Sequence, residues 1–185
     1  VHKRLLAQIP AVADVHLHDL YEHYPNFDID IVTEQQLLLQ HDVIIFQHPL
    51  YWYSSPALIK QWLDLVLEHG WAYGSKGTAL AGKKWLQVIS SGGSAEAYKE
   101  TGRNKFTLSQ FLLPFRQTAA LCGMEFLPPF AVHGTHRLND ADIELHALQY
   151  EQMLFALRQN RITHDELKSV QYMNDIIPIP QAIQS

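Results

Sequence analysis

The chain has 185 residues, of which 47% are hydrophobic and 18% charged, and its formal net charge is −5. This length suits one domain, since a single core serves roughly 100–200 residues, and the apolar fraction excludes a disordered chain. No apolar run approaches the ~18–20 residues of a membrane span, no signal-peptide pattern is present, and the acidic balance argues against a nucleic-acid-binding protein. Cys122 is the single cysteine, which excludes an intrachain disulfide framework and a cysteine zinc cluster.

The first third of the chain predicts two helices and two strands. Residues 1–9 have the pattern of the end of an amphipathic helix. Residues 14–19 alternate between apolar side chains and histidine, which is typical of a strand near a sheet edge. A helix is predicted from Thr33, with Gln36 placed for a capping box, and the apolar run 43–46 predicts a strand buried on both faces.

The rest of the chain alternates between helix and strand. Ser55-Pro56 is typical of a helix start, and the glycines of 69–83 indicate a long loop. The later predictions are a strand at 85–89, a helix at 107–122 that stops at Gly123, a strand at 126–132 broken by Pro128-Pro129, a helix from Asn139 or Asp140 to about Gln159, and an extended tail at 161–185.

This alternation predicts βαβ units and a parallel sheet covered on both sides. The opening helix has no strand before it, so a first strand is expected upstream of Val1. The predicted fold is therefore a doubly wound three-layer sandwich with a five-stranded sheet, in which residues 1–160 form the domain and 161–185 form the tail.

Ligands of an open parallel sheet bind beyond the carboxyl ends of its strands, which directs attention to two loops. The loop 47–56 carries three consecutive aromatic residues, and the loop 90–94 carries the pair Gly92-Gly93, which permits close approach of the backbone. Together they predict a slot for a planar heteroaromatic cofactor. The alternative, in which the aromatic residues pack in the core or in a subunit interface and the glycines form a plain turn, stays open at this point.

Two long stretches carry a family resemblance, FQHPLYWYSSPALIKQWLDLVLEHGWAYG and LAGKKWLQVISSGGSAEAY. They resemble the flavodoxin-like NAD(P)H:quinone oxidoreductase family. Within that family, HDLYEHYPNFDID and LPPFAVHGT are most similar to the ancillary flavoproteins of the bacterial glutathione-regulated potassium-efflux system. The resemblance extends to about residue 158 and implies the five-stranded flavodoxin-like fold.

The resemblance also implies a flavin cofactor, FMN rather than FAD because no additional adenine-binding segment is recognisable, with NAD(P)H as hydride donor. The loop that holds the flavin phosphate in the family would precede Val1. The implied flavin-contacting residues are Pro49, Leu50, Tyr51, Trp52 and Tyr53 in the first loop, and Ser90, Ser91, Gly92 and Gly93 in the second.

Further roles follow from the same resemblance. Tyr98 matches a tyrosine that assists charge relay when hydride reaches the flavin, but the histidine of that relay is replaced here by Asn104. Asparagine donates hydrogen bonds but exchanges no proton near neutral pH, so a relay through this position is doubtful. Trp71 and Tyr73 match a segment that reaches the partner's active site in dimeric relatives, and we therefore expect a homodimer.

The implied function is two-electron reduction of quinones by NAD(P)H, combined with service as an ancillary subunit of a potassium-efflux transporter. Such a subunit would be cytoplasmic, on the inner face of the inner membrane, and would dock on the transporter's cytoplasmic domain. The alternatives are a non-catalytic regulatory subunit and an electron-transfer flavodoxin. The loop 69–83 argues against the flavodoxin, because a pure electron carrier needs no roofed substrate pocket.

Histidine pairs and the lone cysteine favour no competing chemistry. His16/His18 and His133/His136 lack a carboxylate or thiolate that would complete a metal site, so we interpret them as surface or loop residues and expect no metal. Cys122 precedes Gly123 at an apolar helix end, which is typical of a small buried side chain rather than a redox sensor.

Overall fold

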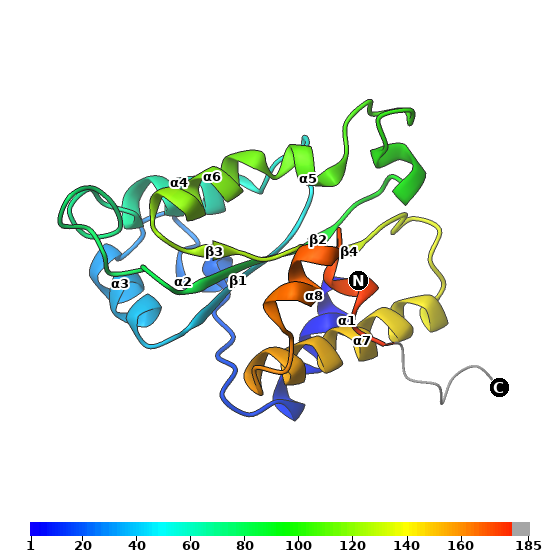
Figure 1. Ribbon diagram of the computed structural model, residues 1–185, viewed down its shortest axis with the longest axis horizontal. Coiled ribbons are helices and arrows are strands. Elements are labelled where there is room, and N and C mark those ends of the chain that lie inside the picture. Colours follow the sequence, from blue (N-terminus) through cyan, green and yellow to red (C-terminus); the bar gives the residue numbers. More distant parts are fainter. Residues whose placement is uncertain (179–185) are drawn as a thin grey trace.

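The computed structural model describes residues 1–178 and shows an open parallel sheet between two layers of helices (Figure 1). Strand β1 (Val43–Pro49) pairs with β2 (Lys84–Ser90) in parallel along its whole length. Two short strands, β3 (Glu125–Phe126) and β4 (Phe130–Val132), both pair in parallel with the other edge of β2. They form one strand position that is interrupted at Pro128-Pro129, so the predicted parallel sheet and its proline break are confirmed.

Strand β2 is the centre of the sheet and is buried on both faces. Its Trp85 and Ile89 pack in an apolar cluster on one face, and its Leu86 and Val88 pack in a second cluster on the opposite face. The first cluster is covered by α3 (Ile31–Leu39), α4 (Ala57–Val66), α5 (Leu108–Phe111) and α6 (Leu113–Leu121), and the second by α1 (His2–Leu6), α7 (Asp140–Arg158) and α8 (His164–Ser169) (Figure 1).

Capping residues explain where several helices begin. Asn139 caps α7 in a reciprocal capping box with Asp142, as the sequence predicts. The predicted start of α3 at Thr33 is wrong, because the Asp30 carboxylate accepts the Thr33 amide and hydroxyl and so caps a helix that begins at Ile31.

The predicted strand at 14–19 is also wrong. Residues 15–19 have no regular secondary structure and lead into the short helix α2 (Leu20–His23), which Asp19 caps. A strand needs a neighbour for its backbone groups, and within residues 1–178 β1 has a strand partner on one edge only. The segment is held by side chains instead, since His18 binds the buried carboxylate of Glu34 at 2.7 Å.

The predicted extended tail is wrong over its described part, which contains α8 and a 3₁₀ helix at Met173–Asp175. Met173 is fully buried, and its amide donates to the carbonyl of Pro129. The Asn174 side chain accepts the amide of Ala131 at 2.8 Å, so this segment takes the place of a further strand beside β4. Residues 179–185 of the expected tail lie outside the described residues.

Candidate functional site

Three loops meet at the carboxyl ends of the strands: 50–56 after β1, 91–94 after β2, and 133–139 after β4. Backbone hydrogen bonds join them side by side. The Leu50 amide donates to Ser90 O (2.8 Å), and the Ser91 amide donates to Val132 O (2.9 Å). The prediction that the aromatic loop and the double-glycine loop lie together is therefore confirmed.

The aromatic loop folds into a tight turn with an unfavourable backbone. Tyr51 and Ser54 exchange both backbone hydrogen bonds, at 3.0 and 2.9 Å, around Trp52 and Tyr53. These two residues have φ of 49° and 62°, in the left-handed region that bulky residues avoid. Trp52 is 94% exposed and Tyr51 59% exposed, which excludes the core-packing alternative. Strain held at an exposed aromatic turn is typical of a functional site.

The two glycines of the double-glycine loop are explained by a lack of space for larger side chains. A Cβ atom on Gly93 would lie 3.1 Å from the Tyr98 ring, and one on Gly92 would lie 2.8 Å from the His136 imidazole. Neither glycine has a positive φ, so it is the lack of space for a side chain, and not a left-handed backbone, that explains glycine at these positions. Within residues 1–178 the amides of Gly92 and Gly93 donate to no other group and are available to a ligand.

His133 and His136, which sequence reasoning assigned to an ordinary loop, are part of this site. His133 Nδ1 lies 2.9 Å from Ser91 Oγ, and its ring lies 5.3 Å from the ring of Tyr98. Tyr98 is buried and also packs edge-on against Phe111, which stacks on Tyr53 at 4.8 Å. The available signal was position, because these histidines follow the predicted strand at 126–132 and so lie at the same edge of the sheet.

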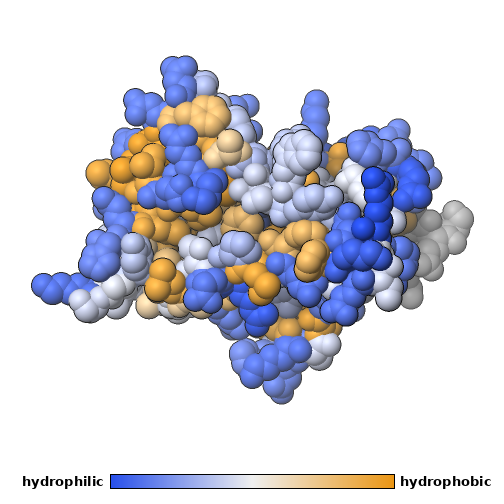
Figure 2. Space-filling model, turned by 90° about the horizontal axis from the view of Figure 1, so that it is seen from above, coloured by the Kyte–Doolittle hydropathy of each residue, from blue (hydrophilic) through white to orange (hydrophobic). Residues whose placement is uncertain are grey.

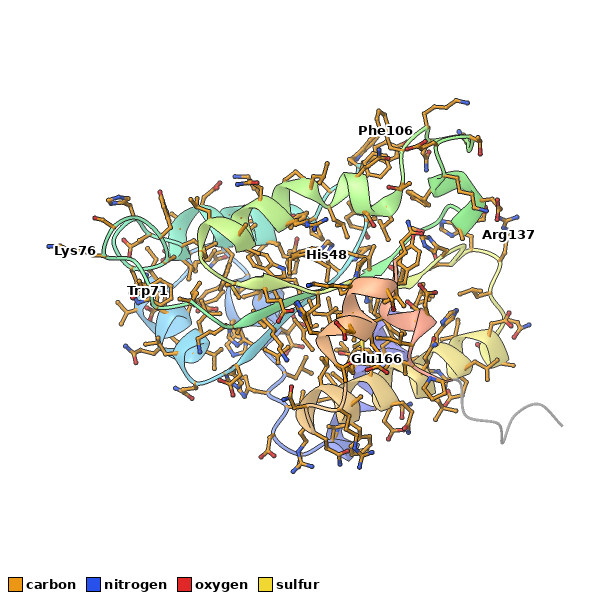
Figure 3. The ribbon with its side chains drawn as sticks, viewed as in Figure 1. His48, Trp71, Lys76, Phe106, Arg137 and Glu166 are labelled. Carbon is orange, nitrogen blue, oxygen red and sulfur yellow. The ribbon has the colours of Figure 1, made fainter. Side chains whose placement is uncertain are left out.

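A buried polar layer lies directly beneath the loops, near the middle of the molecule (Figure 3). His48 Nε2 is 2.7 Å from Gln87 Oε1, its Nδ1 is 3.0 Å from Pro49 O, and its side chain is 2% exposed. His2 Nε2 lies 2.8 Å from Ser90 Oγ. Burial lowers the pKa of His48 and, as the largest cause, lowers the pKa of His2 to about 4.

These buried imidazoles predict acid sensitivity of the fold. Burial lowers the pKa of four histidines, namely His2, His48, His133 and His146. Between pH 6.5 and about 4, their imidazoles therefore bind protons in the unfolded chain that they do not bind in the folded chain. We expect the free energy of unfolding to fall by roughly 1–3 kcal/mol from pH 7 to pH 5. Urea titrations at a series of pH values measure this, and His48→Gln should flatten the slope. A stability that rises on acidification would contradict the prediction.

Trp71 and Tyr73 are not brought to this site within one chain. Their loop lies at the other end of the strands, and Figure 3 shows Trp71 and Lys76 at the end of the molecule opposite Arg137. The loop is compact, since Gly74 has a φ of 88° and a Cβ there would lie 2.6 Å from the His69 ring. Within one chain, the loop 69–83 therefore does not cover the site at the carboxyl ends of the strands.

Other candidate sites contribute less. Cys122 is 2% exposed and burial raises its thiol pKa, as expected of a packing residue. Over residues 1–178, no three His, Cys, Asp or Glu side chains are grouped as a metal site requires. A hollow of about 240 Å³ lies near the carboxyl end of α7, lined by Phe155, Ile162 and Ile176 among others and by no residue of the three loops.

A parallel sheet with helices on both faces and adjacent loops at its carboxyl edge defines the class of doubly wound α/β proteins that bind ligands at that edge. Residues 1–154 match a family described as having a flavodoxin-like fold, and the chain belongs to this family.

Similar proteins agree with this assignment. The chain is 47% identical over 150 residues to the glutathione-regulated potassium-efflux system ancillary protein KefG of Enterobacter, with 81% of this chain and 82% of that protein covered. Among solved structures, general stress protein 14 of Treponema denticola in complex with FMN is 39% identical, with a TM-score of 0.79 over 85% of this chain and 90% of that one. A P. pentosaceus protein named as an NADPH-quinone reductase is 36% identical, with a TM-score of 0.74 over 82% and 86%.

Proposed function

We propose that this chain is a flavin-dependent oxidoreductase that reduces quinones by two electrons at the expense of NAD(P)H. The observation that carries the proposal is a strained, exposed aromatic turn that lies beside the double-glycine loop, since the Leu50 amide just before the turn donates to the carbonyl of Ser90 just before the loop. The similar protein with bound FMN and the similar NADPH-quinone reductase support the cofactor and the substrate class. A flavin held there would supply the two-electron chemistry between the nicotinamide and the quinone.

The residues of the two loops fit a flat conjugated ring. Exposed aromatic side chains at Tyr51 and Trp52 offer faces for stacking, and the free amides of Gly92 and Gly93 offer donors for the polar edge of the ring. FMN is proposed rather than FAD, because the similar structure holds FMN. The residues proposed to hold it are Pro49, Leu50, Tyr51, Trp52, Tyr53, Ser90, Ser91, Gly92 and Gly93.

Tyr98 is the proposed catalytic residue. Its hydroxyl would lie 3.5 Å from a Cβ on Gly93, so it borders the loop that faces the flavin. From there it donates a hydrogen bond that offsets the negative charge developing on the ring during reduction.

The substitution Tyr98→Phe should slow flavin reduction by about threefold to tenfold, because one hydrogen bond is lost. The ring packing against Phe111 and His133 is kept, so the dissociation constant for FMN should stay within twofold of the parent value. Anaerobic stopped-flow reduction by NADPH measures the rate. A rate equal to that of the parent would remove Tyr98 from the mechanism.

We also propose a homodimer in which the loop 69–83 of one copy completes the site of the other. Such an arrangement gives Trp71 and Tyr73 a role that they lack within one chain. Viewed from the side of α4 and α6, the protein has hydrophobic surface gathered over part of this layer (Figure 2). Three leucines of these helices are exposed, namely Leu65, Leu113 and Leu121.

The test of the enzyme proposal is a purification followed by an assay. The protein should copurify with, or take up, FMN in a stoichiometric amount, and it should oxidise NADPH only when a benzoquinone is added. Sedimentation of the same sample tests the dimer. Protein that takes up no flavin, or that retains flavin without quinone-dependent oxidation, would contradict the proposal.

A second proposed function is that of an ancillary subunit on the cytoplasmic domain of a potassium-efflux transporter, supported by the similarity to KefG. Within residues 1–178, no helix is both long and apolar enough to cross a bilayer. Addition of the protein to transporter-containing vesicles should raise potassium efflux. If flavin-free protein has the full effect, the regulatory role does not require turnover, whereas no effect in either form would contradict this role.

A further inference from the structure

His133 occupies a position that the proposed reaction does not yet use. It is the first residue after β4, and its ring lies between Tyr98 at 5.3 Å and Tyr172 at 5.8 Å. Its Nδ1 is 2.9 Å from Ser91 Oγ, while its Nε2 is buried without a hydrogen-bond partner among the described residues. One nitrogen is thus engaged with the double-glycine loop, and the other is buried without a hydrogen bond.

The hydrogen bonds around Ser91 determine which nitrogen carries the proton. Ser91 Oγ donates its only proton to the carbonyl of Gly93, at 3.0 Å, and that carbonyl can only accept. With the hydroxyl proton on the Gly93 carbonyl, the Nδ1–H of His133 donates to Ser91 Oγ, and in the neutral ring Nε2 keeps its lone pair. Protonation adds a charge and an unpaired N–H at the buried Nε2, which favours movement of the ring toward water and so breaks the bond from Nδ1 to Ser91.

The same bonds fix the conformation of the loop. The Gly93 carbonyl accepts from Ser91 Oγ and, at 2.8 Å, from the amide of Gly134. With its carbonyl held by two donors, the peptide plane at Gly93 cannot rotate freely, and this orients the loop whose free amides face the ligand. The hydrogen bonds from His133 to Ser91 and from Ser91 to Gly93 thus connect the imidazole with the conformation of the binding loop.

We propose that neutral His133 is a positioning residue that locks the double-glycine loop in its flavin-binding conformation, and that protonation of His133 releases this lock. The inference deepens the proposed function and rests on it for the identity of the ligand. It makes flavin affinity, rather than the chemical step, the property that responds to pH.

Other titratable groups face His133 from three elements. Tyr98 approaches from the 3₁₀ helix at 95–98, and Tyr172, whose pKa is raised by burial and by Asp175, approaches from the C-terminal segment. His146 of α7 acts on His133 through charge and, with burial as the larger cause, lowers the pKa of His133. Burial also lowers the pKa of His146, and Asp142 opposes this shift.

The experiment measures the dissociation constant for FMN by fluorescence from pH 7.5 to pH 4.5, over the range in which circular dichroism shows folded protein. We expect the parent to lose about tenfold in affinity on acidification, which corresponds to ~1.4 kcal/mol. His133→Asn keeps an N–H for Ser91 and has no titrating nitrogen, so its own affinity for FMN should fall less than threefold between pH 7.5 and pH 4.5. His133→Leu removes the donor and should bind weakly at every pH.

Two control variants separate His133 from its neighbours. His146→Asn should keep the acid-induced loss but move its midpoint to higher pH, because a charge that opposes protonation of His133 is removed. His164→Asn, at an exposed site beside Glu125, should behave as the parent. An acid-induced loss that persists unchanged in His133→Asn would overturn the proposal.

A measurement on flavin-free protein keeps this test independent of the proposed enzyme function. The ¹⁵N spectrum should show His133 neutral with its proton on Nδ1, and its titration should move the amide signals of Gly93 and Gly134 with the same midpoint. His133→Asn should abolish these shifts. A proton on Nε2, or amide signals of Gly93 and Gly134 that do not change during the titration of His133, would contradict the proposed role of His133. Failure of the parent to bind FMN at pH 7.5 would instead refute the proposed function.

Discussion

Replacing Glu34 by leucine is expected to lower the free energy of unfolding by about 3–5 kcal/mol, the usual result of removing one side of a buried ionic cluster. The Glu34 side chain is 2% exposed and accepts three hydrogen bonds. His18 Nε2 and Tyr24 OH bind one oxygen at 2.7 and 2.6 Å, and Trp62 Nε1 binds the other at 2.7 Å. Leucine would leave all three donors buried without an acceptor.

Glu34→Gln is the matched control. The amide keeps one acceptor oxygen, so we expect a smaller loss of about 1–3 kcal/mol. Because the cluster fastens the segment 18–24 to α3 and α4, the loss should appear in urea unfolding, and FMN affinity of the folded variants should be unchanged. Equal losses for the two variants, or a loss below about 1 kcal/mol for leucine, would contradict the role assigned to the carboxylate.

Removing the indole of Trp52 is expected to weaken FMN binding by about tenfold or more, since stacking of a flat ring on an aromatic side chain contributes roughly 1–3 kcal/mol. Trp52→Ala and Trp52→Gly both remove the indole and should lose affinity equally. Their stabilities should differ. At a φ of 49° alanine keeps the unfavourable Cβ, so glycine should be more stable by about 0.5–1 kcal/mol.

The comparison of the two variants distinguishes binding from strain. Fluorescence titration gives the affinity, and urea unfolding of flavin-free protein gives the stability. An unchanged flavin stoichiometry and affinity in Trp52→Ala would contradict the placement of the ring against this turn. Equal stabilities of the alanine and glycine variants would show that the turn stores no strain.

The fold was predictable where local and long-range preferences agree. The run 43–46 and the cap at Asn139 led to correct elements, because a buried parallel strand and a capped helix each have their own pattern. Residues 14–19 have a strand pattern, but pairing requires a neighbouring strand, and the pattern contains no information about one. Likewise, residues 161–178 look irregular in sequence because their order depends on contacts with β4.

The site was predictable to the level of its loops. The positions of the aromatic and glycine loops follow from the rule that parallel strands end at one edge, and the bond from the Leu50 amide to Ser90 O, where both loops begin, agrees with it. The strained turn at 52–53 and the role of His133 were not predictable, because φ angles and hydrogen-bond partners depend on the assembled tertiary structure. The position of loop 69–83 at the opposite end of the sheet was not predictable either, since a long loop has no sequence signal for the end of the sheet on which it lies.

The two edges of the sheet differ in whether a further strand can pair with them. Beside β4, Met173 and Asn174 already bind the outward backbone groups of Pro129 and Ala131, so no foreign strand can add there without first displacing them. Beside β1, the described residues place no such cover. An additional strand can therefore pair with this part of the sheet only beside β1. The carboxyl-terminal segment prevents the strands of other molecules from pairing beside β4.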